Sequence, residues 1–257
     1  MSIGLIIALG LSAAVFVALI VIVIVRGFHP KVVDLPFEFI PLFKGLAAGQ
    51  QERIKALVTG LQVRKNVYII KENATDNSLY YLVKGKVNIL KSGSLYDNLL
   101  KEVNEDEFFG EMAFLNGSQR LASAFATEKS LLIRIDFKNY QAVIDILPEI
   151  KAKIWEAAEL HTIMLCFADY PELRSLNNDQ KFNWISQRKQ LDELSKATTL
   201  EANFEWLALI SGRIEVNQIR YNAPSLIRLS PSALMTPIEK CRISLLPKCE
   251  LEYKKSG

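Results

Sequence analysis

An uncharged, hydrophobic run from Ile3 to Val25 constrains this chain more than any other feature of its sequence. One serine and two glycines are its only members that are not hydrophobic. As a helix rising about 1.5 Å per residue, the run would extend roughly 34 Å, enough to cross a hydrocarbon core of about 30 Å with some tilt. A cleaved signal peptide would have basic residues before a shorter apolar run, and here none precede it. The run therefore predicts an uncleaved, single-pass transmembrane anchor over residues 1–26.

Positively charged residues follow the run directly. Arg26, His29 and Lys31 lie on its C-terminal side, and by the positive-inside rule such residues stay in the cytoplasm or its organellar equivalent. We therefore expect a membrane location, with the lipid bilayer as one partner and the C-terminal domains on the cytoplasmic side. Small residues at four-residue spacing from Gly4 to Ser12 can form a contact with a membrane-protein partner or a second copy of the chain. The alternative is that small residues are simply common in membrane helices.

Three prolines follow the predicted anchor. Pro30, Pro36 and Pro41 favour extended backbone around them, so residues 27–40 are expected to form a linker with an apolar stretch able to pack on a neighbouring surface. The whole chain of 257 residues is long enough for one large domain or two small ones.

The composition and the motifs exclude several functions. A net charge of +3 is too small to argue for a nucleic-acid partner. Three cysteines without a C-x-x-C pair indicate buried thiols in a reducing compartment rather than disulfides or a zinc site. With only two histidines, and with no nucleophile–base pair or P-loop pattern, the sequence predicts no enzyme, no catalytic residues and no metal.

Short segments of alternating apolar residues dominate the middle of the chain. Their regular spacing, with turn-rich pieces between them, is typical of an antiparallel sandwich or roll. Helices are expected at Gln50–Leu61 ahead of the strands, and at Phe137–Leu147 and Pro148–Leu165 after them. The predicted fold class is therefore mainly β with flanking helices. The expected strands are Val63–Ile70, Ser78–Leu90, Leu99–Val103 and Leu131–Ile135, with Ala124–Asp136 as the closing segment.

The stretch from Phe108 to Ser123 has the residue types that hold a phosphorylated sugar. Gly110 lets the backbone come close to an anion, and backbone N–H groups at the start of a short helix attract it. The carboxylate of Glu111 can accept a hydrogen bond from a sugar hydroxyl, and Arg120 offers a planar fork of donors to a phosphate.

This stretch resembles the phosphate-binding cassette of cyclic-nucleotide-binding domains, whose pattern runs F-G-E-[aliphatic]-A-[aliphatic]-x(5)-R-A-A-[ST]. The Pro41-Leu42-Phe43 start and the strand–turn–strand around Gly85 also resemble the family, so the resemblance covers about residues 41–165. It implies a β-roll, also called a jelly roll, of the kind found in the cAMP receptor protein. The positions that fall on the cassette pattern in register are Phe109, Gly110, Glu111, Ala113, Arg120, Ala122 and Ser123.

The resemblance also implies ligand contacts for these residues. Glu111 would bond the ribose 2′-hydroxyl, Arg120 would pair with the cyclic phosphate, and Ser123 would touch the phosphate or a purine edge. The expected ligand is cAMP or cGMP, and no other cofactor is expected. The residues expected to bind it are Phe109, Gly110, Glu111, Met112, Ala113, Arg120, Leu121, Ala122 and Ser123.

Each of these residues also has a plainer interpretation. Glu111 could be a first-turn acid that stabilises its own short helix, Arg120 a solvated or ion-paired surface arginine, and His161 on the last helix a satisfied packing histidine. The acids of 105–107 would repel an anion if they lay near the cassette, and Leu121 stands where the family has a small residue.

The C-terminal part contains a second, weaker version of the same pattern. Trp206–Ile214 parallels Leu79–Val87 at an offset of 127, and Ile238–Cys241 parallels Thr127–Ser130 at an offset of 111. The two offsets differ by about the length of the cassette, which predicts that residues 166–257 form a smaller, degenerate roll without it, starting with helices over Asp169–Ala197. The alternative is a chance alignment of a few apolar letters. No helix-turn-helix pattern follows the first roll, so a DNA-binding regulator is not expected.

Two functions of different classes fit this organisation. The first is a membrane-anchored regulatory protein that senses cAMP or cGMP and modulates a membrane partner. The alternative is a non-catalytic accessory subunit of a membrane complex, in which the cyclic-nucleotide-binding-like fold serves as an interaction scaffold.

Overall fold

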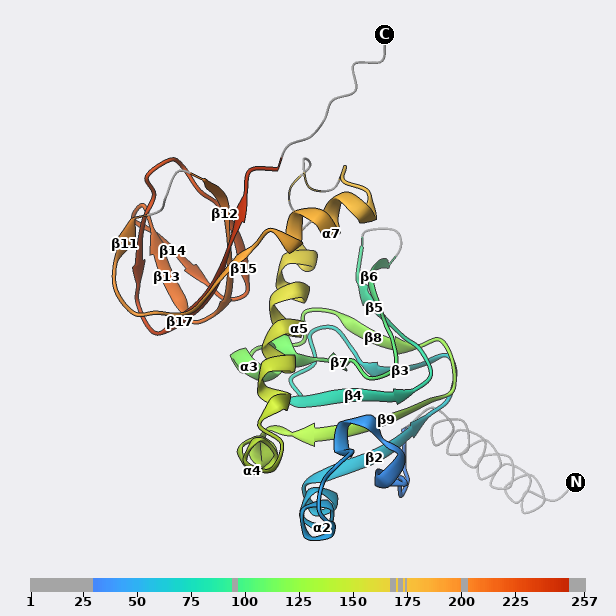
Figure 1. Cartoon of the computed structure of the whole chain (residues 1–257). Helices are drawn as coiled ribbons and strands as arrows, with labels where there is room; N and C mark the ends of the chain where they lie inside the picture. Colours follow the sequence, from blue (N-terminus) through green and yellow to red (C-terminus); the bar gives the residue numbers. More distant parts are fainter. Residues whose placement is uncertain are drawn as a thin grey trace, which may run out of the picture.

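The structure, a computed structural model, describes residues 30–93, 97–166, 170, 173, 175–199 and 203–249. Within those residues, no helix is both long and apolar enough to cross a bilayer. The predicted anchor over residues 1–26 lies outside the described residues. The described part is mainly β with flanking helices, as predicted, and consists of two rolls with one long helix between them (Figure 1).

The first roll is made of two antiparallel sheets that pack face to face. One sheet has the strand order β1-β2-β9-β4-β7 and the other has the order β3-β8-β5-β6. The strands are β1 Lys31–Val32, β2 Val58–Val63, β3 Val67–Ile70, β4 Ser78–Lys84, β5 Val87–Lys91, β6 Asn98–Val103, β7 Phe108–Phe109, β8 Ser123–Ala126 and β9 Ser130–Asp136. The helices are the short 3-10 turns η1 Phe37–Phe39, η2 Pro41–Phe43 and η3 Phe137–Asn139, and α2 Ala48–Leu57, α3 Glu111–Asn116, α4 Tyr140–Ile146 and α5 Glu149–Cys166.

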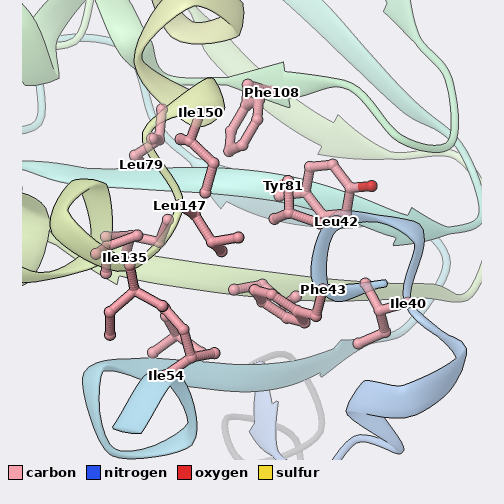
Figure 2. Packing of buried hydrophobic residues seen from close by; sticks show 14 of the residues in the cluster. Ile40, Leu42, Phe43, Ile54, Leu79, Tyr81, Phe108, Ile135, Leu147 and Ile150 are labelled. Atoms are coloured by element: carbon pink, nitrogen blue, oxygen red, sulfur yellow. The ribbon is translucent and has the colours of Figure 1, made fainter. Parts of the chain in front are cut away.

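Strand β4 is buried on both faces, and its two sets of alternating residues serve two different cores. Leu79 and Tyr81 pack with the helices that cover the outside of the sheet, whereas Tyr80 and Leu82 pack between the two sheets. Because side chains alternate across a strand, a near-continuous apolar run is what a strand covered on both faces requires. Figure 2 shows Leu79 and Tyr81 beside Leu147 and Ile150 in the outer core.

The segment predicted as a linker packs against the first roll. Its short strand β1 pairs with β2, with Lys31 opposite Gln62. Leu35, Phe37 and Ile40 are buried in the outer core, and Ile40 lies near Phe43 in Figure 2. The apolar stretch noted in the sequence therefore covers the sheet of the roll.

The second roll repeats the strand order of the first. Its sheets run β10-β17-β12-β15 and β11-β16-β13-β14, which is the order of the first roll with every strand number raised by eight, apart from β1. The elements are α7 Asn178–Ser186, β10 Lys189–Leu194, β11 Thr198–Thr199, β12 Phe204–Ser211, β13 Arg213–Val216, β14 Ile219–Asn222, β15 Ser225–Arg228, β16 Leu234–Pro237 and β17 Cys241–Pro247.

Strand β12 also divides its side chains between two cores in the way that β4 does. Trp206 and Ala208 pack toward α5 and α7, whereas Leu207 and Leu209 pack inside the roll. The link between β15 and β16, residues 229–233, contains no helix, whereas α3 lies between β7 and β8 in the first roll. That the second roll is a degenerate copy of the first stays a prediction. The structure shows that the two rolls share a strand order, and that β4 and β12 each divide their side chains between two cores.

Two of the predicted helical stretches differ from the helices in the structure. The helix predicted over Gln50–Leu61 stops at Leu57, because the residues from Val58 onward pair with β9 as strand β2. Among the described residues of 169–197, only α7 and an isolated helical position at Leu173 are helical. Lys189–Leu194 forms strand β10 and pairs with β17, so the prediction of helices over that whole stretch is wrong. In both places pairing with a distant strand overrides the local helical pattern.

Gly85 lies in the turn between β4 and β5 and gives a test of the fold. Its φ is +107°, and an added Cβ would lie 2.8 Å from the Lys129 carbonyl oxygen and 2.6 Å from Ser130 Oγ. We expect Gly85→Ala to lower the free energy of unfolding by about 2 kcal/mol. Gly49→Ala is the matched control, since nothing lies within 4 Å of its added Cβ inside α2 and alanine stabilises a helix interior by about 0.5–1 kcal/mol. Urea unfolding of both variants checks this, and equal losses would contradict it.

Candidate functional site

The cassette residues form a tight turn followed by the short helix α3. Gly110 joins β7 to α3 with φ +82°, and an added Cβ there would lie 2.9 Å from Arg120 Nη1 and 3.0 Å from Ile70 Cδ1. Gly117, at φ +60°, ends the helix. Gly110 therefore has both the conformation that favours glycine and a close contact with the arginine of the cassette.

Glu111 is buried at the first position of α3, where only 1% of its surface is exposed. Its Oε1 lies 2.7 Å from Nδ1 of His161, which is on α5. Its Oε2 is also buried, and no described residue gives it a hydrogen-bond partner. Burial raises the pKa of Glu111, but the His161 imidazole, through its charge and its hydrogen bond, outweighs burial and holds that pKa below the ordinary value. The carboxylate is therefore ionised at neutral pH and has one oxygen unpaired.

The lowered pKa of Glu111 predicts acid sensitivity. A carboxyl group with a folded-state pKa below its unfolded value of 4.5 stabilises the fold fully above that value, and the contribution is lost as the pH falls through the folded pKa. We expect the stability difference between the wild type and Glu111→Gln to be constant at neutral pH and to shrink below pH 4.5. Urea unfolding over a pH series measures it. A difference that stays constant down to acid unfolding would contradict the ion pair with His161.

Arg120 is buried and makes its contacts within the protein. Nε and Nη2 donate to the two carboxylate oxygens of Asp76 at 3.3 and 2.6 Å. Nη1 donates to the Gly110 carbonyl oxygen at 2.7 Å, and Nη2 also donates to the Ser78 carbonyl oxygen at 2.6 Å. The alternative interpretation of Arg120 is right about an ion pair, which Asp76 supplies, and wrong about a surface position, since only 2% of the residue is exposed. A guanidinium group has five N–H donors, so the second N–H of Nη1 is the one without an acceptor among the described residues.

The loop between β3 and β4 holds Arg120 in place. The Arg120 N–H donates to the Ala74 carbonyl oxygen at 2.9 Å, and its own carbonyl accepts from the Asn73 N–H at 2.8 Å. Asn73 has φ +65°, a left-handed conformation that asparagine tolerates better than most residues. The same loop supplies Asp76, so the loop fixes both the backbone and the side chain of the arginine.

A cavity lies between the cassette, the β-sheet and α5. Eight of the nine expected ligand-binding residues line it, and Ser123 does not: its Oγ accepts a hydrogen bond from the Glu72 N–H at 3.0 Å. Two polar residues of the cavity were not expected from the sequence, Lys101 on β6 and His161 on α5. The residues that line it are Ile70, Ile89, Leu100, Lys101, Phe109, Gly110, Glu111, Met112, Ala113, Arg120, Leu121, Ala122, Ala124, His161, Met164 and Leu165.

The acids of 105–107 do not line this cavity. Glu105 accepts from the Gly85 N–H and Asp106 accepts from the Tyr81 hydroxyl. Glu107 accepts from the Asn104 N–H and lies 3.0 Å from the Lys101 ammonium group. Each carboxylate is therefore paired within a neighbouring turn or strand, which weakens the expected repulsion of an anion. Among the described residues, the buried side-chain atoms of the cavity without a hydrogen-bond partner are Glu111 Oε2 and His161 Nε2.

The geometry of the cassette agrees with the comparison to known families. Residues 61–146 match the family model "Cyclic nucleotide-binding domain". The matched range contains strands β3 to β9, the cassette and every residue that lines the cavity except His161, Met164 and Leu165. The first roll is therefore a cyclic nucleotide-binding domain, a regulatory fold.

Two curated relatives match 59% and 42% of the chain. The cGMP-dependent protein kinase 2 of Mus musculus is 26% identical over 157 residues, which cover 59% of this chain and 19% of the kinase. The cyclic AMP receptor protein of Thermus thermophilus is 28% identical over 109 residues, which cover 42% of this chain and 50% of the receptor protein. The chain thus spans half or less of the length of these relatives.

Solved structures add little to the sequence matches. The catabolite activator protein of Thermus thermophilus is 26% identical, with a TM-score of 0.38, over 49% of this chain and 63% of that protein. The assignment of the first roll therefore depends on the family match and on the cassette geometry.

Proposed function

We propose that this chain is a membrane-anchored regulatory protein that binds cAMP or cGMP in its first roll and modulates a membrane partner. The observation that carries the proposal is the buried Oε2 of Glu111, which is unpaired among the described residues and belongs to the cavity of a cyclic nucleotide-binding domain. A buried polar atom without a partner costs about 1–3 kcal/mol, and a ligand hydroxyl would remove that cost.

The positive groups of the cavity suit the phosphate of such a ligand. Arg120 keeps one N–H of Nη1 for it, and Lys101 places a second positive charge in the cavity wall. Charge-assisted hydrogen bonds of this kind are stronger than neutral ones. The apolar residues from the sheet and from α5 would cover the base.

A conformational change caused by ligand binding would reach the second roll through α3 and α5, the helices that border the cavity. Asn116, at the end of α3, donates to its own helix at Met112 and to the Ile210 carbonyl oxygen of β12 at 3.2 Å. Glu159 on α5 accepts from Arg188 of the second roll at 2.8 Å. A ligand that binds one position of α3 and α5 better than another shifts the population of both rolls together.

Binding is tested on the full chain with isothermal titration calorimetry. We expect heat of binding with cAMP or cGMP and none with the open-chain nucleotide 5′-AMP, and we expect Glu111→Gln to weaken binding. No heat with either cyclic nucleotide at millimolar concentration contradicts the proposal. Membrane anchoring depends on the sequence of residues 1–26 and is tested separately, by asking whether alkaline carbonate leaves the full chain in the membrane fraction.

A structural accessory subunit is the second candidate, and the state of Arg120 favours it. Four acceptor contacts within the protein already satisfy most of its guanidinium group, as expected of a cassette kept for stability alone. Co-purification in a mild detergent distinguishes the two candidates: a chain that isolates alone and binds a cyclic nucleotide contradicts the accessory role.

A further inference from the structure

The cavity of the first roll contains two unpaired buried polar atoms, one from each side. Oε2 of Glu111 belongs to α3 and Nε2 of His161 belongs to α5; both are buried, and neither has a hydrogen-bond partner among the described residues. The two residues line the same cavity and are joined by the 2.7 Å contact between Oε1 and Nδ1. Native proteins leave few buried polar atoms unpaired, and these two, which lie in one cavity, could both bond a single polar ligand.

Holding α5 against the roll does not require this pair. Ile150 and Ile154 of the same helix are fully buried in the outer core of the first roll. Glu159 holds the helix to the second roll through Arg188, Gln190 and Ser244. A buried charged group is an expensive way to dock a helix that apolar residues already dock, so packing alone explains His161 poorly.

The contact with Glu111 fixes which nitrogen of His161 faces the ligand. An ionised carboxylate only accepts hydrogen bonds, so Nδ1 carries the proton that is donated to Oε1. Nε2 is then the free nitrogen, on the side of the ring away from Nδ1. The charged groups that face the pair are Lys101 from β6 and Arg120 from the cassette.

We propose that His161 is a ligand-contacting residue. In this arrangement Glu111 Oε2 accepts a hydrogen bond from the hydroxyl of a cyclic ribonucleotide, while His161 Nε2 forms a hydrogen bond with a second polar group of the same ligand. The inference rests on the proposed function and extends it. The hydroxyl is bound by the Glu111–His161 pair, and this pair exists only while α5 lies against α3.

Two amide variants separate the two nitrogens of His161. An asparagine amide reaches the place of Nδ1, so His161→Asn keeps the bond to Glu111 and lacks the group at Nε2. A glutamine amide reaches the place of Nε2, so His161→Gln does the reverse. The experiment measures the Kd of the full chain for cAMP and for cGMP by calorimetry, and the urea midpoint without ligand. Lys153→Ala, at an exposed position of the same helix that does not line the cavity, is the matched control.

We expect His161→Asn to raise the Kd about tenfold, the value of one typical hydrogen bond, while its ligand-free midpoint stays at the wild-type value. His161→Gln should have a Kd within about threefold of the wild-type value and a lower urea unfolding midpoint than the wild type. If His161→Asn binds the nucleotide as tightly as the wild type does, the inference about His161 is overturned, while the proposal that the chain binds a cyclic nucleotide still stands. A wild type that binds neither nucleotide overturns both.

Discussion

Replacing Glu159 with alanine is expected to lower the free energy of unfolding by about 3 kcal/mol, because it removes the acceptor that joins α5 to the second roll. Only 3% of Glu159 is exposed. Its carboxylate accepts from Arg188 Nε at 2.8 Å, from the Gln190 amide and from the Ser244 hydroxyl. Removing one member of a buried pair leaves the remaining charge without compensation, and three donors lose their acceptor at once.

Urea unfolding of the full chain measures this effect, with Glu156→Ala as the matched control. Glu156 lies on the same helix but is exposed, so its loss should change stability by less than about 0.5 kcal/mol. Glu159→Gln keeps an acceptor oxygen and should fall between the two. If Glu159→Ala and Glu156→Ala unfold at the same urea concentration, the carboxylate cluster does not hold the two rolls together.

Replacing Arg120 with alanine is expected to weaken cyclic-nucleotide binding about 10- to 100-fold, the range of a hydrogen bond to a charged group. The variant should also lose about 2 kcal/mol of stability, because Asp76 and the carbonyls of Gly110 and Ser78 lose their donor. Asp76 stays partly exposed, with 44% of its side chain accessible, so water compensates part of the loss and the cost is below that of a fully buried pair.

Calorimetry and urea unfolding of the same samples separate the two effects of Arg120→Ala. Arg120→Lys keeps the charge without the planar fork, so it should recover part of the binding and little of the stability. Arg53→Ala removes an exposed arginine of α2 and should change neither. Unchanged nucleotide affinity in a folded Arg120→Ala protein would show that the arginine serves the fold alone, as the accessory-subunit alternative requires.

The cassette and the roll could be predicted from the sequence because both depend on local chemistry. Gly85 and Gly110 occupy positions where only a residue without a Cβ fits. A glycine at each of these positions in the sequence therefore indicates the turn. The near-continuous apolar run of β4 reports a strand with two covered faces. Its counterpart β12, 127 positions later, divides its side chains in the same way, which the sequence offset had indicated.

Contacts between distant segments could not be predicted in this way. The pairing of Glu111 with His161 joins residues on two different helices, and no spacing rule links them. Arg120 is a phosphate ligand in the sequence pattern, yet its partner Asp76 belongs to a loop more than forty residues earlier. The end of α2 at Leu57 is likewise set by the pairing of the next residues with β9.

Helix α5 makes the two rolls depend on each other when the chain unfolds. Its first half, through Ile150 and Ile154, completes the core of the first roll, and its second half, through Ala158 and Ile163, completes the core of the second. Without this helix, which lies between the two rolls in Figure 1, the outer core of each roll loses part of its cover. The chain should therefore melt as a single cooperative unit, with no folded half left behind.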